Sequence, residues 1–276
     1  MEHKKERGRY ALNGFTLVSG ATGGLGGAFV RLLAERGEYL ILTGRSEEKL
    51  RVLHEKLKAE FPALYIEHIA CDLTDENDRK LLLAGVSDIC KRLELPLKRL
   101  INVAGADIQK ALAEYTEEKI LFQCRVNFES AVSLCRGAIT LGVKEIINIS
   151  SVSGIYPMPY FAIYSATKGA LTSFSLALRE EMKGAGVRVT AVLPGAIPTR
   201  DDVKEQIKGQ GLWGKIAAKE PRFVAEKALK AAEKNKGKVV VGFANKLMNF
   251  GTKLIPLKLK LKFIAKRWSK IQKDAF

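Results

Sequence analysis

The chain has only four cysteines and three histidines among its 276 residues. Cys71, Cys90, Cys124 and Cys135 show no Cys-x-x-Cys spacing, and the histidines do not cluster with them. The sequence therefore predicts neither a metal site nor a disulfide framework, and we expect a protein of the reducing cytoplasm.

Long apolar runs are also missing. No segment approaches the roughly 20 apolar residues that span a bilayer, and the basic first ten residues lack the form of a signal peptide. Internal repeats and low-complexity tracts are absent. At 47% hydrophobic, the chain can bury a full core. We expect one domain over residues 1–252, followed by a basic tail over residues 253–276.

Short apolar runs alternate with helical stretches along most of the chain. This alternation predicts an α/β fold, a doubly wound (Rossmann) and mostly parallel seven-stranded sheet with helices on both faces. In such a sheet, the carboxyl ends of the first, fourth and fifth strands meet at one crevice. We expect the strands near Thr16–Ser19, Tyr39–Thr43, Tyr65–Ala70, Arg99–Val103, Glu145–Ser150, Val187–Leu193 and Lys238–Val241.

A tyrosine and a lysine stand four residues apart, at Tyr164 and Lys168. On a helix they share one face, so the ammonium can favour the ionised phenol over its normal pKa of roughly 10. Ser151 ends a predicted buried strand, where its hydroxyl can reach the same substrate oxygen. The three residues suit proton transfer to a carbonyl or from an alcohol. The alternative is a half-buried ring beside a solvated lysine.

A glycine-rich turn, Gly20–Gly26, lies between the first predicted strand and a predicted helix that starts at Gly27. Strand, glycine turn and helix in this order present backbone N–H groups and a helix amino terminus to a pyrophosphate. Glycine spacing alone has low specificity, and a glycine loop without a ligand is the alternative. The flanking strand and helix favour nucleotide binding.

With both motifs in place, the chain resembles the short-chain dehydrogenase/reductase family from about Asn13 to Gly242. The family's Thr-Gly-x-x-x-Gly-x-Gly appears here as Ser19–Gly26, with serine in place of threonine. Further matches are Cys71-Asp72-Leu73, Asn102-Val103-Ala104-Gly105 and Pro194-Gly-Ala-Ile-Pro-Thr199. The resemblance assigns these residues to nucleotide binding: Gly20, Thr22, Gly23, Gly24, Leu25, Gly26, Asp72, Leu73, Asn102, Ala104, Gly105, Tyr164, Lys168, Pro194, Gly195, Ile197 and Thr199.

The resemblance also implies catalytic roles. Tyr164 would donate the proton, and Ser151 would bond the substrate oxygen. Lys168 would lower the pKa of the tyrosine and bond the nicotinamide ribose, while Asn127 would support a water that restores the proton. The alternatives are that Ser151 only caps the loop after its strand and that Asn127 only satisfies helix backbone.

The residues after the second predicted strand bear on the nucleotide. Enzymes that use NAD generally place Asp or Glu there, but this chain has Gly44-Arg45-Ser46. A guanidinium can pair with a 2′-phosphate, and family members with Gly-Arg-Ser here favour NADP. We expect Arg45 and Ser46 to bind NADP(H); the alternative is an arginine that lies in water at the end of the strand.

The segment between Ser151 and Tyr164 is apolar and aromatic, which suits a pocket for a lipophilic substrate. Tyr156, Met158 and Phe161 are the candidate lining residues. Packing against neighbouring helices or a second subunit is an equally good account. The family places a mobile substrate lid near residues 196–220, which here contain Trp213.

Acidic residues are few in the tail, where eight basic residues and one acidic residue give +7 of the formal net charge of +16. Leu257, Leu261, Ile264, Trp268 and Ile271 recur at helical spacing, although residues 257–263 also alternate as in a strand; we favour the helix. Such a helix suits contact with an anionic membrane surface. Packing on the domain or on a partner subunit is the alternative. No element suited to reading nucleic acid is apparent.

We therefore expect an NADP(H)-dependent oxidoreductase that reduces a lipophilic carbonyl or oxidises the matching alcohol. Its sequence resembles the family branch with 3-oxoacyl reductases and 17β-hydroxysteroid dehydrogenases, and we expect a homodimer or homotetramer. The alternative is a non-catalytic protein of the same fold that senses NADP(H) or binds a membrane or partner.

Overall fold

The computed structural model describes residues 14–199, 218–253 and 255–269. A seven-stranded sheet, parallel throughout, has the strand order β3-β2-β1-β4-β5-β6-β7. This confirms the predicted fold and places each strand within two residues of its expected start. The strands are β1 (Phe15–Ser19), β2 (Tyr39–Gly44), β3 (Ile66–Ala70), β4 (Leu97–Asn102), β5 (Glu145–Ile149), β6 (Arg188–Leu193) and β7 (Lys238–Val240).

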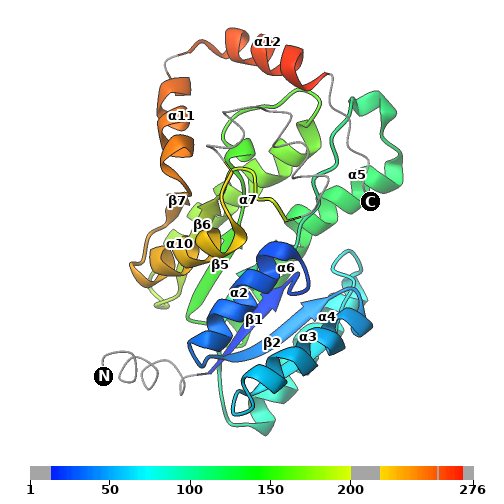
Figure 1. The fold of residues 1–276 in the computed structure, drawn as a ribbon, viewed down its shortest axis with the longest axis vertical. Helices are drawn as coiled ribbons and strands as arrows, with labels where there is room; N and C mark the ends of the chain where they lie inside the picture. The colour runs from blue at the N-terminus through cyan, green and yellow to red at the C-terminus, as the bar shows by residue number, and fades with distance from the viewer. Residues whose placement is uncertain (1–13, 200–217, 254, 270–276) are drawn as a thin grey trace.

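Helices cover both faces of the sheet (Figure 1). Successive strand residues point to opposite faces, so Leu17 and Leu100 enter one core while Val18 and Ile101 enter the other. The Val18 face is covered by α2 (Gly24–Glu35), α3 (Glu47–Glu60) and α10 (Pro221–Glu233), and the Leu17 face by α4 (Glu76–Arg92), α6 (Ser130–Thr140) and α7 (Ala162–Glu181). The 3-10 helix η1 (Leu112–Glu114), α5 (Glu117–Cys124) and the π-helix η2 (Arg125–Glu129) precede α6.

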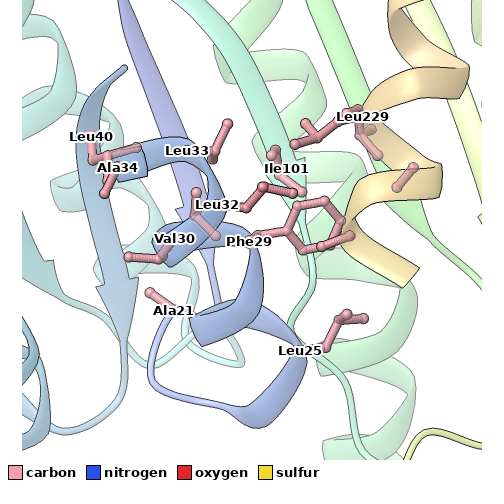
Figure 2. Packing of buried hydrophobic residues seen from close by; sticks show 14 of the residues in the cluster. Ala21, Leu25, Phe29, Val30, Leu32, Leu33, Ala34, Leu40, Ile101 and Leu229 are labelled. Atoms are coloured by element: carbon pink, nitrogen blue, oxygen red, sulfur yellow. The ribbon is translucent and has the colours of Figure 1, made fainter. Parts of the chain in front are cut away.

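Helices α2 and α10 pack side by side on the first of these faces. Figure 2 shows Phe29 of α2 directed toward α10, which contributes Leu229. Both side chains are fully buried. A fully buried side chain of this size contributes about 1.5–3 kcal/mol of hydrophobic stabilisation, so this packing holds α2 against α10.

A buried ion network connects neighbouring strands near their amino-terminal ends. The Arg99 guanidinium on β4 pairs with Glu38 at 2.5 Å and with Glu145 on β5. Glu38 also accepts a hydrogen bond from Thr16, and Glu145 pairs with the more exposed Arg188 at 2.7 Å. Arg99, Glu38 and Glu145 are at most 3% exposed. The mutual pairing is what makes burial of these charges tolerable.

The described part of the carboxyl-terminal segment contains two helices. It forms α11 (Phe243–Lys253) and α12 (Leu257–Trp268), so α11 begins before the tail boundary expected at residue 253. In Figure 1 the two helices, orange and red, lie apart from the sheet at the top of the view. Within the described residues, no helix has the length and apolar character needed to cross a membrane.

Candidate active site

The proposed proton-transfer residues converge from two elements. Ser151 follows the end of β5, and Tyr164 lies in the first turn of α7. Both residues line one cavity, and the Ser151 hydroxyl lies close enough to Tyr164 to influence the pKa of its phenol. Ser151 also accepts a hydrogen bond from the backbone N–H of Ser153 at 3.1 Å, which caps the 3-10 helix η3 (Val152–Gly154). Ser151 therefore has the capping role that the alternative assigned to it, and it lines the cavity as well.

Lys168 fastens α7 to the end of β5. Its Nζ donates a hydrogen bond to the carbonyl oxygen of Ile149 at 3.0 Å and lies 5.8 Å from the centroid of the Tyr164 ring. Its own carbonyl oxygen accepts from the Ser150 hydroxyl at 2.7 Å. Only 4% of Lys168 is exposed, so the alternative of a solvated lysine does not apply.

Burial controls the titration of both groups. It raises the pKa of Tyr164 above its ordinary value of 10, the negative charge of Asp107 raises it further, and the hydrogen bond with Ser151 opposes both. Burial lowers the pKa of Lys168 to about 8, against the influence of Asp107. The sequence predicted a lowered tyrosine pKa; the direction is wrong, because loss of hydration outweighs other influences on this buried phenol. The phenol is thus protonated at neutral pH.

Asn127 lies in the π-helix η2, where a widened turn interrupts the helical run into α6. Its Oδ1 accepts from the backbone N–H of Ala106 at 2.7 Å, and its Nδ2 donates to the carbonyl oxygen of Ala106 at 2.8 Å and to Thr167 at 3.2 Å. Asn127 is buried and connects the loop after β4 to α7. These contacts position the loop, and the water-holding role stays a prediction.

The glycine turn packs too closely to admit side chains. Gly20 has a φ of +65°, and a Cβ there would lie 2.9 Å from the Cα of Ala104. A Cβ at Gly26 would overlap the carbonyl oxygen of Gly20, and one at Gly24 would lie 2.7 Å from the Cβ of Thr199. These approaches keep the backbone of the turn bare, as close binding of a pyrophosphate requires.

Ser19, at the end of β1, is bonded to the loop that follows β4. Its Oγ accepts hydrogen bonds from the backbone N–H groups of Val103 and Ala104, at 3.1 and 3.3 Å. Serine thus holds β1 against the loop after β4, and this bond needs only the hydroxyl group.

One cavity of about 1180 Å³ extends from the glycine turn to the proton-transfer residues. Most of the residues predicted from sequence line it. They are Gly20, Thr22, Gly23, Gly24, Leu25, Gly26, Arg45, Asp72, Leu73, Ala104, Gly105, Ser151, Tyr156, Met158, Phe161, Tyr164, Lys168, Pro194, Gly195, Ile197 and Thr199.

Three predicted residues that the structure describes have other positions. Ser46 caps α3 by accepting from the backbone N–H of Lys49 at 3.3 Å. The Asn102 side chain is buried beneath the sheet, where it donates to Asn148 at 2.8 Å. Neither lines the cavity, and nor does Asn127. Trp213 and most of the expected lid, residues 200–217, lie outside the described residues.

The end of the cavity near the glycine turn includes the exposed guanidinium of Arg45. Arg45 follows β2, and its Cζ lies 5.5 Å from the ring centroid of Phe122. Asp72 organises the neighbouring turn, because its Oδ1 accepts from the backbone N–H and the hydroxyl of Thr74 at 2.9 and 2.8 Å. Arg45 lines the cavity, and its contact with a 2′-phosphate stays a prediction.

Sequence reasoning missed two groups of lining residues. Asp107 follows the Asn-Val-Ala-Gly motif and lines the cavity near Tyr164. Helices α11 and α12 add side chains that include Phe243, Leu247 and Trp268. The helical stripe of the tail was visible in the sequence, but nothing local indicated that part of it faces the site.

The fold and the cavity are typical of an α/β oxidoreductase that uses a nucleotide cofactor. The glycine turn lies at one end of the cavity and Ser151, Tyr164 and Lys168 lie at the other. The family model for short chain dehydrogenase matches residues 15–208. The chain belongs to the short-chain dehydrogenase family. Helices α11 and α12 lie beyond the matched residues.

Similar proteins include enzymes of known reaction. A 3-oxoacyl-[acyl-carrier-protein] reductase of Bos taurus is 32% identical over 199 residues, covering 69% of this chain and 79% of the relative. A short-chain dehydrogenase from Sphingobium yanoikuyae, solved with NADPH, is 25% identical with a TM-score of 0.69, covering 87% of this chain and 93% of that one. A 7β-hydroxysteroid dehydrogenase has a TM-score of 0.78 at 22% identity, covering 94% and 98%, and shares the fold.

Proposed function

We propose that the protein is an NADP(H)-dependent oxidoreductase that reduces a lipophilic ketone, or oxidises the matching secondary alcohol. The observation that carries this proposal is the convergence of Ser151, Tyr164 and Lys168 on the cavity that begins at the glycine turn. A substrate carbonyl placed there would meet a proton donor, a hydrogen-bond donor and the nucleotide site together.

The glycine cradle fits a dinucleotide. A Cβ at Gly20, Gly24 or Gly26 would collide with atoms of the turn or its neighbours, so these three positions keep backbone N–H groups available to the ligand. We assign the 2′-phosphate of NADP to Arg45, whose exposed guanidinium lies at the rim of the same cavity. The NADPH complex of the Sphingobium yanoikuyae relative supports this choice.

In the reductive direction, bound NADPH supplies the hydride that reduces the carbonyl carbon. Tyr164 transfers its phenolic proton to the carbonyl oxygen, and Ser151 donates a hydrogen bond to that oxygen. A phenol with a raised pKa is in the protonated form that this step needs. The Lys168 ammonium then stabilises the phenolate until Tyr164 regains a proton from solvent, by way of a water that we assign to the Asn127 region.

The substrate end of the cavity favours a lipophilic molecule. Met158 and Phe161 form a cluster with Ile264 of α12, and Tyr156 and Trp268 pack against it. Apolar and aromatic walls with few polar groups favour substrates with hydrocarbon or ring surfaces. The 3-oxoacyl reductase activity named for the Bos taurus relative supports a 3-oxoacyl chain, and a steroid is the other candidate.

The test is a panel of 3-oxoacyl thioesters, steroid ketones and short water-soluble ketones, assayed for NADPH oxidation. We expect turnover to rise with apolar surface and to disappear in Tyr164→Phe. Turnover that is absent from the whole panel while NADPH binds tightly would support the non-catalytic alternative. Turnover retained by Tyr164→Phe would contradict the assigned proton donor.

A further inference from the structure

Helices α11 and α12 carry an unusual concentration of exposed apolar side chains. Eight of the thirteen large hydrophobic residues that are exposed in the described parts of the chain fall between residues 243 and 263. Scattered exposed apolar residues are normal, but a contiguous group on a soluble protein marks an interaction surface. The five that also line the cavity are Phe243, Leu247, Met248, Ile255 and Phe263.

These five residues stand at the mouth of the cavity, because each one both lines it and is exposed. Phe263 is 69% exposed and Phe243 is 80% exposed. Deeper in the same cavity, Ile264 is only 9% exposed and packs with Met158 and Phe161. An apolar path therefore runs from the outer surface of α11 and α12 to the aromatic cluster beside Tyr164.

Helix α12 has two apolar faces. Ile264 and Trp268, four residues apart, pack inward, and the indole stacks on Phe161. Leu259 and Phe263, also four apart, share an exposed face. The inner face holds the helix on the domain, so the outer face is left for a partner.

The outer face lies among basic residues. Lys258, Lys262 and Lys266 recur at four-residue spacing beside it and are exposed. The sequence contains neither Asp nor Glu from residue 243 to residue 273. A second copy of the chain would place these lysines against one another with no acidic residue to pair them, so the charge disfavours self-association through this face.

We propose that α11 and α12 form a membrane-docking surface that rests on an anionic lipid bilayer and lets lipophilic substrate pass from the bilayer into the cavity. The lysines attract lipid headgroups, and the exposed rings enter the headgroup region. The delivery of substrate rests on the proposed function, whereas the docking does not.

The test of docking uses the full chain and vesicles of phosphatidylcholine, with or without phosphatidylserine. We expect the protein to sediment with the vesicles that contain phosphatidylserine and not with those that lack it. The sedimented fraction should fall as the salt concentration rises. The variant Lys258→Glu/Lys262→Glu/Lys266→Glu should bind them about 100-fold more weakly, or worse, since each lysine near the surface is worth about a factor of five. Lys49→Glu/Lys56→Glu/Lys91→Glu, on α3 and α4, changes the net charge equally and should bind like the unaltered protein.

The apolar part of the surface is tested by Leu259→Ser/Phe250→Ser. Both residues are exposed, at 59% and 66%, and neither lines the cavity. This variant should lose vesicle binding while its melting temperature and its turnover of a short soluble ketone stay unchanged. The docking surface would be overturned if the full-length protein did not bind anionic vesicles at low salt. It would also be overturned if the Lys258→Glu/Lys262→Glu/Lys266→Glu variant bound them as tightly as the unaltered protein. Concentration-dependent dimers abolished by Leu259→Ser/Phe250→Ser, without vesicle binding, would assign the face to a second copy instead.

Substrate delivery is tested separately, with a lipophilic ketone dissolved in the vesicles. The α12 charge-reversal variant should reduce this ketone at least tenfold more slowly than the unaltered protein, and both should reduce a soluble ketone at equal rates. Equal rates on the vesicle-borne ketone would overturn delivery. If no ketone is reduced but vesicle binding depends on α12, the proposed reaction fails and the docking surface stands.

Discussion

The indole of Trp268 stacks against the ring of Phe161, with their centroids 6.2 Å apart. Phe161 in turn stacks on Tyr164 at 4.3 Å. The last described helix thus contacts the aromatic group that supports the proposed proton donor. A segment beyond the matched family residues takes part in the site.

The stack leads to a prediction for Trp268→Ala. An aromatic pair contributes about 0.5–1.5 kcal/mol beyond its buried area, so KM for a lipophilic ketone should rise about two- to tenfold, with NADPH affinity unchanged. Leu259→Ala, on the exposed face of α12, serves as the control. It should not change KM for a ketone presented in detergent. Steady-state kinetics and nucleotide titration measure both, and an unchanged KM in Trp268→Ala would remove α12 from the substrate site.

Tyr164→Phe removes the proposed proton donor but leaves the ring and its packing. Proton transfer from a positioned side chain contributes about 10²–10⁴-fold to rate, so kcat should fall by at least about 100-fold while NADPH still binds. Tyr156→Phe, which alters another phenol lining the cavity, is the control and should retain most of the activity. Near-normal turnover in Tyr164→Phe would contradict the mechanism.

Arg45→Asp tests the choice of nucleotide. A charge-assisted pair worth about 1.5–3 kcal/mol would be replaced by repulsion, so the Kd of NADPH should rise by about 10-fold to 150-fold or more. NADH lacks the 2′-phosphate, so its Kd should change little. Fluorescence titration of both nucleotides measures the difference, and an equal loss for both would mean that Arg45 does not contact the phosphate.

Asp107→Asn should shift the pH dependence of alcohol oxidation. The Asp107 charge raises the pKa of both Tyr164 and Lys168, so its removal lowers both. Oxidation needs the ionised phenol as a base, and its alkaline rise should therefore move to lower pH. The profile of kcat/KM against pH measures this shift. Asp88→Asn, on the exposed side of α4, is the control and should not shift the profile. A rise that moved to higher pH in Asp107→Asn would contradict the effect assigned to the Asp107 charge.

The buried ion network predicts a large effect on stability. Glu145→Gln removes the shared partner of Arg99 and Arg188 and leaves the Arg99 charge less compensated. Breaking a buried pair in this way costs about 3–5 kcal/mol in the free energy of unfolding. The exposed i,i+4 pair of Arg51 and Glu55 is the control, and Glu55→Gln should cost at most about 0.5 kcal/mol. Urea denaturation measures both; equal losses would contradict the importance of the network.

Much of the nucleotide site could be predicted because its signals are local. The glycine turn at Gly20–Gly26 needs bare backbone between a strand and a helix, and that need appears directly in the residue types. The same holds for Tyr164 and Lys168, whose spacing sets them on one helical face. The sheet followed from apolar runs at regular intervals, since a strand buried on both faces is apolar throughout. Asn102 and Ser46 show the limit, because a motif does not reveal whether a polar side chain faces the cavity, packs under the sheet or caps a helix.

The sequence by itself determined the order of strands and helices, the glycine turn, and the Ser151, Tyr164 and Lys168 group. Only the tertiary structure decided that burial raises the pKa of Tyr164, and that Ile264 and Trp268 face inward while Leu259 and Phe263 face outward. Helical spacing defines which residues share a face, but the direction of that face depends on the surfaces that fold against it. For α12 these surfaces come from residues about 100 positions earlier in the chain, which no local pattern can supply.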